Sequence, residues 1–201
     1  MRKPDVIMRI DSAWKELSET IDKEHEIYLK SHTQQQLADR HFVIWEEADI
    51  PFQLGRFLLN NEDDGKFKFH LEMNLTSSNF DGYKFAENGS LEKVRKKLGK
   101  KARVDFLVDD MSGDHFAAIG EAKYFRYSIE GISRGKRTVL EAIDEDYEKL
   151  KTFLENHVCK YGVYLVVDKY YHRREPQTWK KIAKRLNDIE SKGIYVFRKE
   201  V

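Results

Sequence analysis

The sequence predicts an α/β protein in which a central mixed β-sheet is flanked by helices. Residues 103–108 and 116–125 are β-prone runs separated by a polar turn around Gly113, which is typical of an antiparallel hairpin. Residues 138–157 carry apolar side chains at helical spacing, and residues 161–167 form a nearly continuous apolar run. Such a run suits a strand buried on both faces. A strand, a helix and a second strand in succession indicate a parallel crossover, so the sheet is expected to be mixed.

The other elements also follow from periodicity. Residues 4–37 have an apolar stripe at helical spacing. A second helical stretch covers residues 42–60, where Pro51 either kinks the segment or opens a new helix in its first turn. Residues 66–75 alternate apolar and polar side chains, which predicts a strand with one apolar face.

Two further helices are expected on either side of the central hairpin. A short one is predicted to begin with Ser90 as its N-cap and to end at Gly99. The other spans residues 176–189 and precedes a final strand at 194–197. In the helix at 138–157, four acidic residues are expected to be solvated: Asp144, Glu145, Asp146 and Glu148.

Length and composition indicate a single domain with a highly charged surface. The chain has 201 residues, of which 40% are hydrophobic and 35% charged, and its formal net charge is +1. We expect a core at 42–168, an N-terminal helical extension at 1–41 and a C-terminal αβ addition at 169–201. The single Cys159 excludes an internal disulfide framework. No apolar run is long enough for a membrane span, so a cytoplasmic protein is expected.

Three charged residues lie inside the predicted hairpin strands. A turn centred on Gly113 places Asp105 opposite Glu121, and Lys123 projects to the same face as Glu121. Opposed like charges destabilise a sheet, so the two carboxylates need a compensating charge. A divalent cation between them would supply it, because hard cations such as Mg²⁺ take oxygen ligands. The alternative is an ordinary cross-strand ion pair between Asp105 and Lys123 on a solvated face.

Local basic clusters are the candidate nucleic-acid contacts, because the net charge itself gives no such signal. One cluster surrounds the short helix before the hairpin, and another lies in the glycine-containing connector at 126–137. The residues expected to contact phosphates are Lys96, Lys97, Lys100, Lys101, Arg134, Lys136 and Arg137. The alternative is a solvated helix face. Residues 170–174 are predicted to form an aromatic and basic loop. This loop could bind a nucleic-acid strand by stacking and charge, or it could be a basic surface turn.

The order of elements between residues 42 and 167 is helix, three strands, helix, strand. That order, with Asp105 on the second strand and Glu121-Ala122-Lys123 on the third, resembles the restriction-endonuclease-like PD-(D/E)XK nuclease superfamily. Val104 occupies the position of the proline in the name of the motif. The resemblance implies an αβββαβ core to which the terminal segments are additions.

The resemblance also implies roles for individual residues. Asp105 and Glu121, with the Ala122 carbonyl, would bind Mg²⁺, for which Mn²⁺ is a substitute, and Lys123 would assist the attacking water. A further catalytic glutamate often comes from the first core helix, and Glu47 or Glu46 matches it. Glu72 is most simply part of the polar face of its strand, with a place near the metal as the alternative.

The function expected from this resemblance is metal-dependent hydrolysis of phosphodiester bonds in DNA by a restriction- or repair-type endonuclease. The residues do not distinguish DNA from RNA, and a homodimer is compatible with them. The alternative is a catalytically inactive module of the same fold that binds nucleic acid or a protein partner. In that case no metal binds, and Asp105 and Lys123 form an ion pair.

Overall fold

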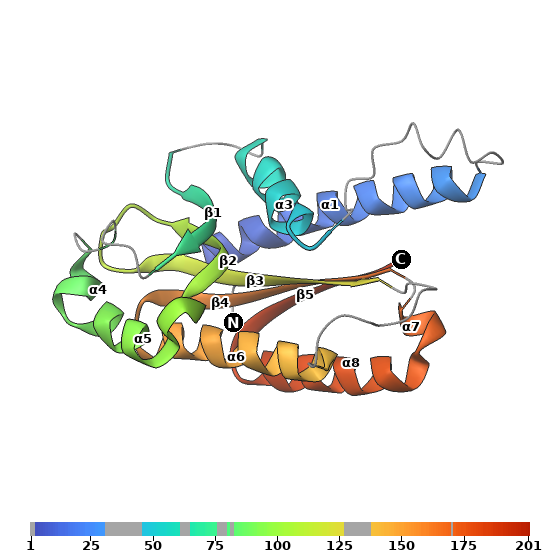
Figure 1. Ribbon diagram of the computed structural model, residues 1–201. Coiled ribbons are helices and arrows are strands. Elements are labelled where there is room, and N and C mark those ends of the chain that lie inside the picture. Colours follow the sequence, from blue (N-terminus) through green and yellow to red (C-terminus); the bar gives the residue numbers. More distant parts are fainter. Residues whose placement is uncertain are drawn as a thin grey trace.

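The computed structural model describes residues 3–30, 46–60, 65–75, 80, 83–126, 138–169 and 171–201. These residues form an α/β fold in which one five-stranded mixed sheet lies between two layers of helices (Figure 1). The predicted α/β class, a mixed sheet flanked by helices, is therefore confirmed. None of the helices in the described ranges has the length and hydrophobicity needed to cross a membrane.

The strands follow chain order across the sheet. They are β1 (Lys68–Asn74), β2 (Arg103–Asp109), β3 (Phe116–Arg126), β4 (Cys159–Lys169) and β5 (Ile194–Glu200). β1, β2 and β3 pair antiparallel, whereas β3, β4 and β5 pair parallel. The hairpin and the parallel crossover predicted from the sequence are both present, and β5 extends the same sheet.

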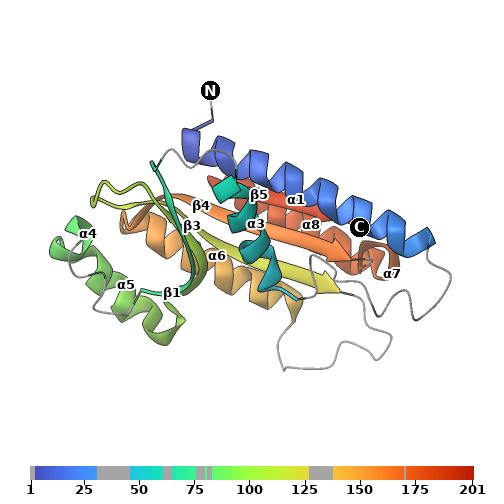
Figure 2. The same ribbon diagram turned by 90° about the horizontal axis from the view of Figure 1, so that it is seen from above.

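Helices cover both faces of this sheet (Figures 1 and 2). One face carries α1 (Asp5–Lys30) and α3 (Asp49–Asn60), and the other carries α5 (Ser90–Leu98), α6 (Val139–Glu155) and α8 (Pro176–Ser191). Three single-turn elements complete the described chain: α4 (Lys84–Glu87), η2 (Gly99–Lys101) and α7 (Tyr171–Arg174). The apolar side chains accordingly form two clusters, one on each face of the sheet.

Several helix boundaries have clear local causes. Pro51 lies in the first turn of α3, where its missing N–H is not needed. Of the two alternatives predicted for Pro51, it therefore opens a new helix and does not kink a longer one. α6 begins with a capping box in which Thr138 and Glu141 each accept a hydrogen bond from the other's backbone N–H. Gly99 ends α5 with a positive φ of 53°. The prediction of Ser90 as N-cap is wrong, because Gly89 is the N-cap and Ser90 is already helical.

Two other predictions need correction. The alternation of β1 is interrupted at Glu72, whose φ of 50° turns the backbone, and Leu71 is 36% exposed. β1 therefore lacks the single apolar face expected from its sequence. The segment at 170–174 contains the helical turn α7 rather than a loop; Tyr170 lies outside the described residues. Of the predicted first helix, positions 31–37 also lie outside them.

The Phe106 ring lies against Gly120 where β2 and β3 are paired. A Cβ atom on Gly120 would lie 2.0 Å from Cζ of Phe106. The Phe106 ring in turn stacks on Phe69 at 5.5 Å, and a Cβ on Gly55 would lie 2.6 Å from that second ring. Two glycines thus make room for an aromatic pair between α3 and the sheet.

Gly120→Ala is expected to destabilise the protein by about 1–3 kcal/mol or more, because the Phe106 ring must leave its place. Equilibrium urea unfolding would measure the change. Gly162→Ala is the matched control on β4, where the nearest atom, Cγ1 of Ile194, is 3.2 Å away and the smaller clash should cost less. Equal destabilisation by the two substitutions would contradict the prediction.

Candidate active site

The predicted site residues lie where β2 and β3 separate. The β2–β3 ladder pairs Phe106 with Gly120 and Val108 with Ala118, which is the register that brings Asp105 beside Glu121. The ladder ends at Gly120, but β3 continues to pair with β4 as far as Arg126. Beyond Gly120, the edge of β3 that faces β2 is therefore unpaired among the described strands.

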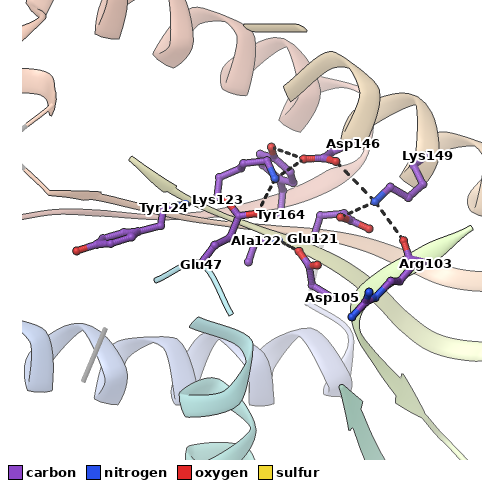
Figure 3. A network of polar contacts seen from close by, with 10 residues as sticks. All are labelled: Glu47, Arg103, Asp105, Glu121, Ala122, Lys123, Tyr124, Asp146, Lys149 and Tyr164. Carbon is purple, nitrogen blue, oxygen red and sulfur yellow. Dashed lines mark hydrogen bonds and ion pairs between the residues drawn. The ribbon is translucent and has the colours of Figure 1, made fainter. Parts of the chain in front are cut away.

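Two carboxylates accept hydrogen bonds from backbone N–H groups along that edge of β3 (Figure 3). The Ala122 N–H donates to Oδ2 of Asp105 at 2.7 Å, and the Tyr124 N–H donates to Oε2 of Glu47 at 3.4 Å. Buried backbone donors need partners, so these contacts compensate for the missing strand. They also fix two carboxylates beside the Glu121-Ala122-Lys123 segment.

Lys123 lies between two carboxylates that come from distant parts of the chain. Its Nζ is 2.9 Å from Oε1 of Glu47 and 3.0 Å from Oδ2 of Asp146, and its side chain is 17% exposed (Figure 3). Burial acts to lower the pKa of the ammonium, but Asp146 and Glu47 outweigh it, so the pKa rises above its ordinary value. Lys123 is thus a fixed positive charge that can donate hydrogen bonds.

Glu121 is the most deeply buried carboxylate of the site, with 2% of its surface exposed. Its Oε2 is 2.7 Å from Nζ of Lys149, whereas its Oε1 has no hydrogen-bond partner among the described residues. Burial raises the pKa of Glu121 well above its usual range; Lys149 opposes the rise, while Asp105 and Asp146 add to it. An additional cation next to Oε1 would therefore stabilise the ionised form.

Asp146 joins the two lysines. It contacts Lys123 at 3.0 Å and Lys149 at 3.6 Å, and it accepts a hydrogen bond from the Tyr164 hydroxyl at 3.2 Å. Burial, followed by Asp146, raises the pKa of Tyr164, which keeps this hydroxyl a neutral donor. The expectation that Asp146 is solvated was wrong, since it is 8% exposed.

The sequence analysis missed Asp146 and Lys149, although a signal for Asp146 existed. Asp146 follows Ile143 by three residues and precedes Leu150 by four, so it lies on the buried face of α6. Polar residues on an apolar helix face are candidates for a site. The partners of Asp146 come from β3 and β4, which no helical pattern could have named.

The composition of the site suits a divalent cation. Four carboxylates meet two ammonium groups, which leaves a formal excess of two negative charges; the residues are Glu47, Asp105, Glu121, Asp146, Lys123 and Lys149. Within the described chain, no three His, Cys, Asp or Glu side chains are grouped so that they alone could hold a metal ion. Mg²⁺ needs only one or two carboxylates, because water and substrate phosphate complete its coordination. Glu121, whose Oε1 has no partner among the described residues, and Asp105 can supply these two carboxylates.

Of the two candidates for the additional catalytic glutamate, Glu46 and Glu47, only Glu47 reaches the site. Glu47 contacts Lys123, whereas Glu46 lies exposed in the same turn. The helix predicted over residues 42–60 contained both residues, but α3 begins at Asp49, so Glu46 and Glu47 lie outside it. Glu72 is instead paired with Arg103 at 2.6 Å on the exposed side of β1.

A groove of about 610 Å³ reaches Asp105 and Lys149, and both basic and acidic side chains line it: Lys97, Lys101, Arg103 and Lys149, with Asp105, Asp144, Glu145, Asp146 and Glu148. Lys97 and Lys101 line it, but they pair with Glu155 at 3.8 Å and with Glu145 at 3.5 Å. Lys96 and Lys100 are exposed. The other predicted phosphate contacts, Arg134, Lys136 and Arg137, lie outside the described residues.

Comparisons of the chain with protein-family models, with curated proteins and with solved structures give no match.

Proposed function

We propose that the protein is a metal-dependent nuclease of the PD-(D/E)XK type that hydrolyses phosphodiester bonds in DNA. One observation carries the proposal: Asp105 meets Glu121-Ala122-Lys123 at the point where β2 and β3 separate. The order of α3, β1, β2, β3, α6 and β4 supports it, because it matches the αβββαβ core of that superfamily.

The carboxylates of Asp105 and Glu121 would hold the metal, Mg²⁺ or Mn²⁺, together with the Ala122 carbonyl. The N–H and C=O of one strand residue point to the same edge, and the Ala122 N–H already faces Asp105. When bound, such a cation polarises a phosphate and lowers the pKa of a coordinated water. The chain itself therefore has to supply orientation and charge.

Lys123 is the residue that would act on the reacting groups. Its ammonium would orient the attacking water and stabilise the negative charge that develops on the phosphate. Glu47 and Asp146 hold the ammonium in place and keep it charged. The groove lined by Lys97 and Lys101 would receive the adjacent nucleic-acid backbone; such contacts position a substrate without reading its sequence.

The direct test is incubation of the purified protein with plasmid and linear DNA in Mg²⁺, in Mn²⁺ and in chelator, beside Asp105→Ala. Cleavage that requires metal and disappears in the variant is the expected result. Cleavage that persists in chelator, or in Asp105→Ala at the wild-type rate, would contradict the proposal.

A second candidate function, a metal-free binding module of the same fold, is favoured by the ion pair between Lys149 and Glu121. That pair already places a positive charge against the buried carboxylate. The two functions differ in a thermal-shift assay with Mn²⁺. A metal that binds only the folded state at 100 times its dissociation constant stabilises it by about 2.7 kcal/mol, whereas the binding module should show no shift.

A further inference from the structure

The Lys149 ammonium is enclosed by oxygen atoms from three different elements. Its Nζ lies 2.7 Å from Oε2 of Glu121 on β3, 3.1 Å from the Arg103 carbonyl on β2 and 3.6 Å from Oδ1 of Asp146 on α6. An ammonium group has three N–H donors, so each can face one of these oxygens. The side chain is 16% exposed, which limits access of water to it.

Two carboxylates and a backbone carbonyl are also the oxygen ligands that hard cations take. Glu121 belongs to this oxygen set and to the proposed metal site. Its second oxygen, Oε1, is buried and has no partner among the described residues. Lys149 thus contacts only one of the two oxygens of Glu121. A divalent cation bound to Glu121 would neutralise the same carboxylate.

We propose that Lys149 is an internal counter-cation that competes with the divalent metal for Glu121. This inference rests on the proposed function and adds a regulatory element to it: metal binds only when the Lys149–Glu121 pair opens. The groove beside Asp105 is also lined by Lys149, so the ammonium has space to move there when it leaves Glu121. In that position it would face the expected path of the phosphate backbone.

The test compares Mn²⁺ binding to wild-type protein and to Lys149→Met by isothermal titration calorimetry without DNA. Methionine keeps an unbranched side chain one heavy atom shorter than that of lysine and removes its charge. Removal of the competitor should tighten Mn²⁺ binding on the order of 10-fold, within the usual range of coupling between two ligands. Lys151→Met is the matched control, because Lys151 lies on the same helix, is 40% exposed and pairs only weakly, at 3.8 Å, with Glu148 and Glu155.

A second measurement uses the wild-type chain and does not depend on the folding of a variant. Acylation of lysines by an N-hydroxysuccinimide ester, followed by mass spectrometry, reports how accessible each amine is. Saturating Mn²⁺ should increase the labelling rate of Lys149 and leave that of Lys151 unchanged. An acylation rate of Lys149 that is the same with and without bound Mn²⁺ would overturn the proposal.

The outcomes separate this inference from the proposed function. Equal Mn²⁺ affinity of wild-type protein and Lys149→Met overturns the competition and leaves the nuclease proposal intact. Binding to Lys149→Met alone supports the competition but contradicts a metal-dependent activity of the wild-type chain. Absence of binding to both proteins overturns both proposals.

Discussion

Lys123→Ala is expected to reduce DNA cleavage by about 10²–10⁴-fold, the usual contribution of a positioned proton-transfer or charge-stabilising group. The ammonium is held by Glu47 at 2.9 Å and by Asp146 at 3.0 Å, and the neighbouring Lys149 is paired with Glu121 instead. Folding should survive, because Asp146 keeps Lys149 and the Tyr164 hydroxyl as partners. Single-turnover cleavage with Mg²⁺ would measure the loss.

The matched control for this prediction is Lys160→Ala. Lys160 lies on β4 and forms an ion pair with Asp110 at 2.8 Å, but its side chain is 41% exposed and far from the site in sequence and register. This variant should cleave at the wild-type rate. Lys123→Ala should also keep its Mn²⁺-dependent thermal shift, because the carboxylates of Asp105 and Glu121 remain. An unchanged cleavage rate in Lys123→Ala would remove Lys123 from the mechanism.

Asp146→Ala is expected to destabilise the protein by about 3–5 kcal/mol, the cost of removing one partner from a buried ion pair. Asp146 serves two ammonium groups at once, and both lysines are less than one-fifth exposed. Without it, Lys123 and Lys149 would be left close together with one carboxylate fewer between them. Equilibrium unfolding in urea, with a check that the slope is unchanged, would measure the difference.

Asp144→Ala tests whether the effect belongs to the buried site rather than to acidic residues of α6 in general. Asp144 lies two residues away, is 52% exposed and pairs with Arg185 at the surface. Exposed ion pairs contribute about 0–1 kcal/mol, so this variant should be close to wild-type stability. If both substitutions destabilise the protein equally, Asp146 does not have the joining role that its contacts indicate.

The sequence determined the features that depend on neighbours in the chain. The hairpin of β2 and β3 follows from two β-prone runs around one turn, and the position of that turn fixed the register that brings Asp105 beside Glu121. The period-two and helical patterns likewise identified the principal strands and helices described here. These predictions succeeded because the spacing of apolar residues reflects the period of a strand or helix, although in β1 it did not predict which side chains are buried.

Only the tertiary structure decided which charges surround that hairpin. Glu47 was not distinguishable from Glu46 in the sequence, and Asp146 was expected in solvent, yet both contact Lys123. Glu47 is 76 residues from Lys123 in the chain, so no local pattern links the two side chains. A buried charge costs less when an opposite charge lies next to it, and that partner exists only once α3, β3 and α6 have packed together.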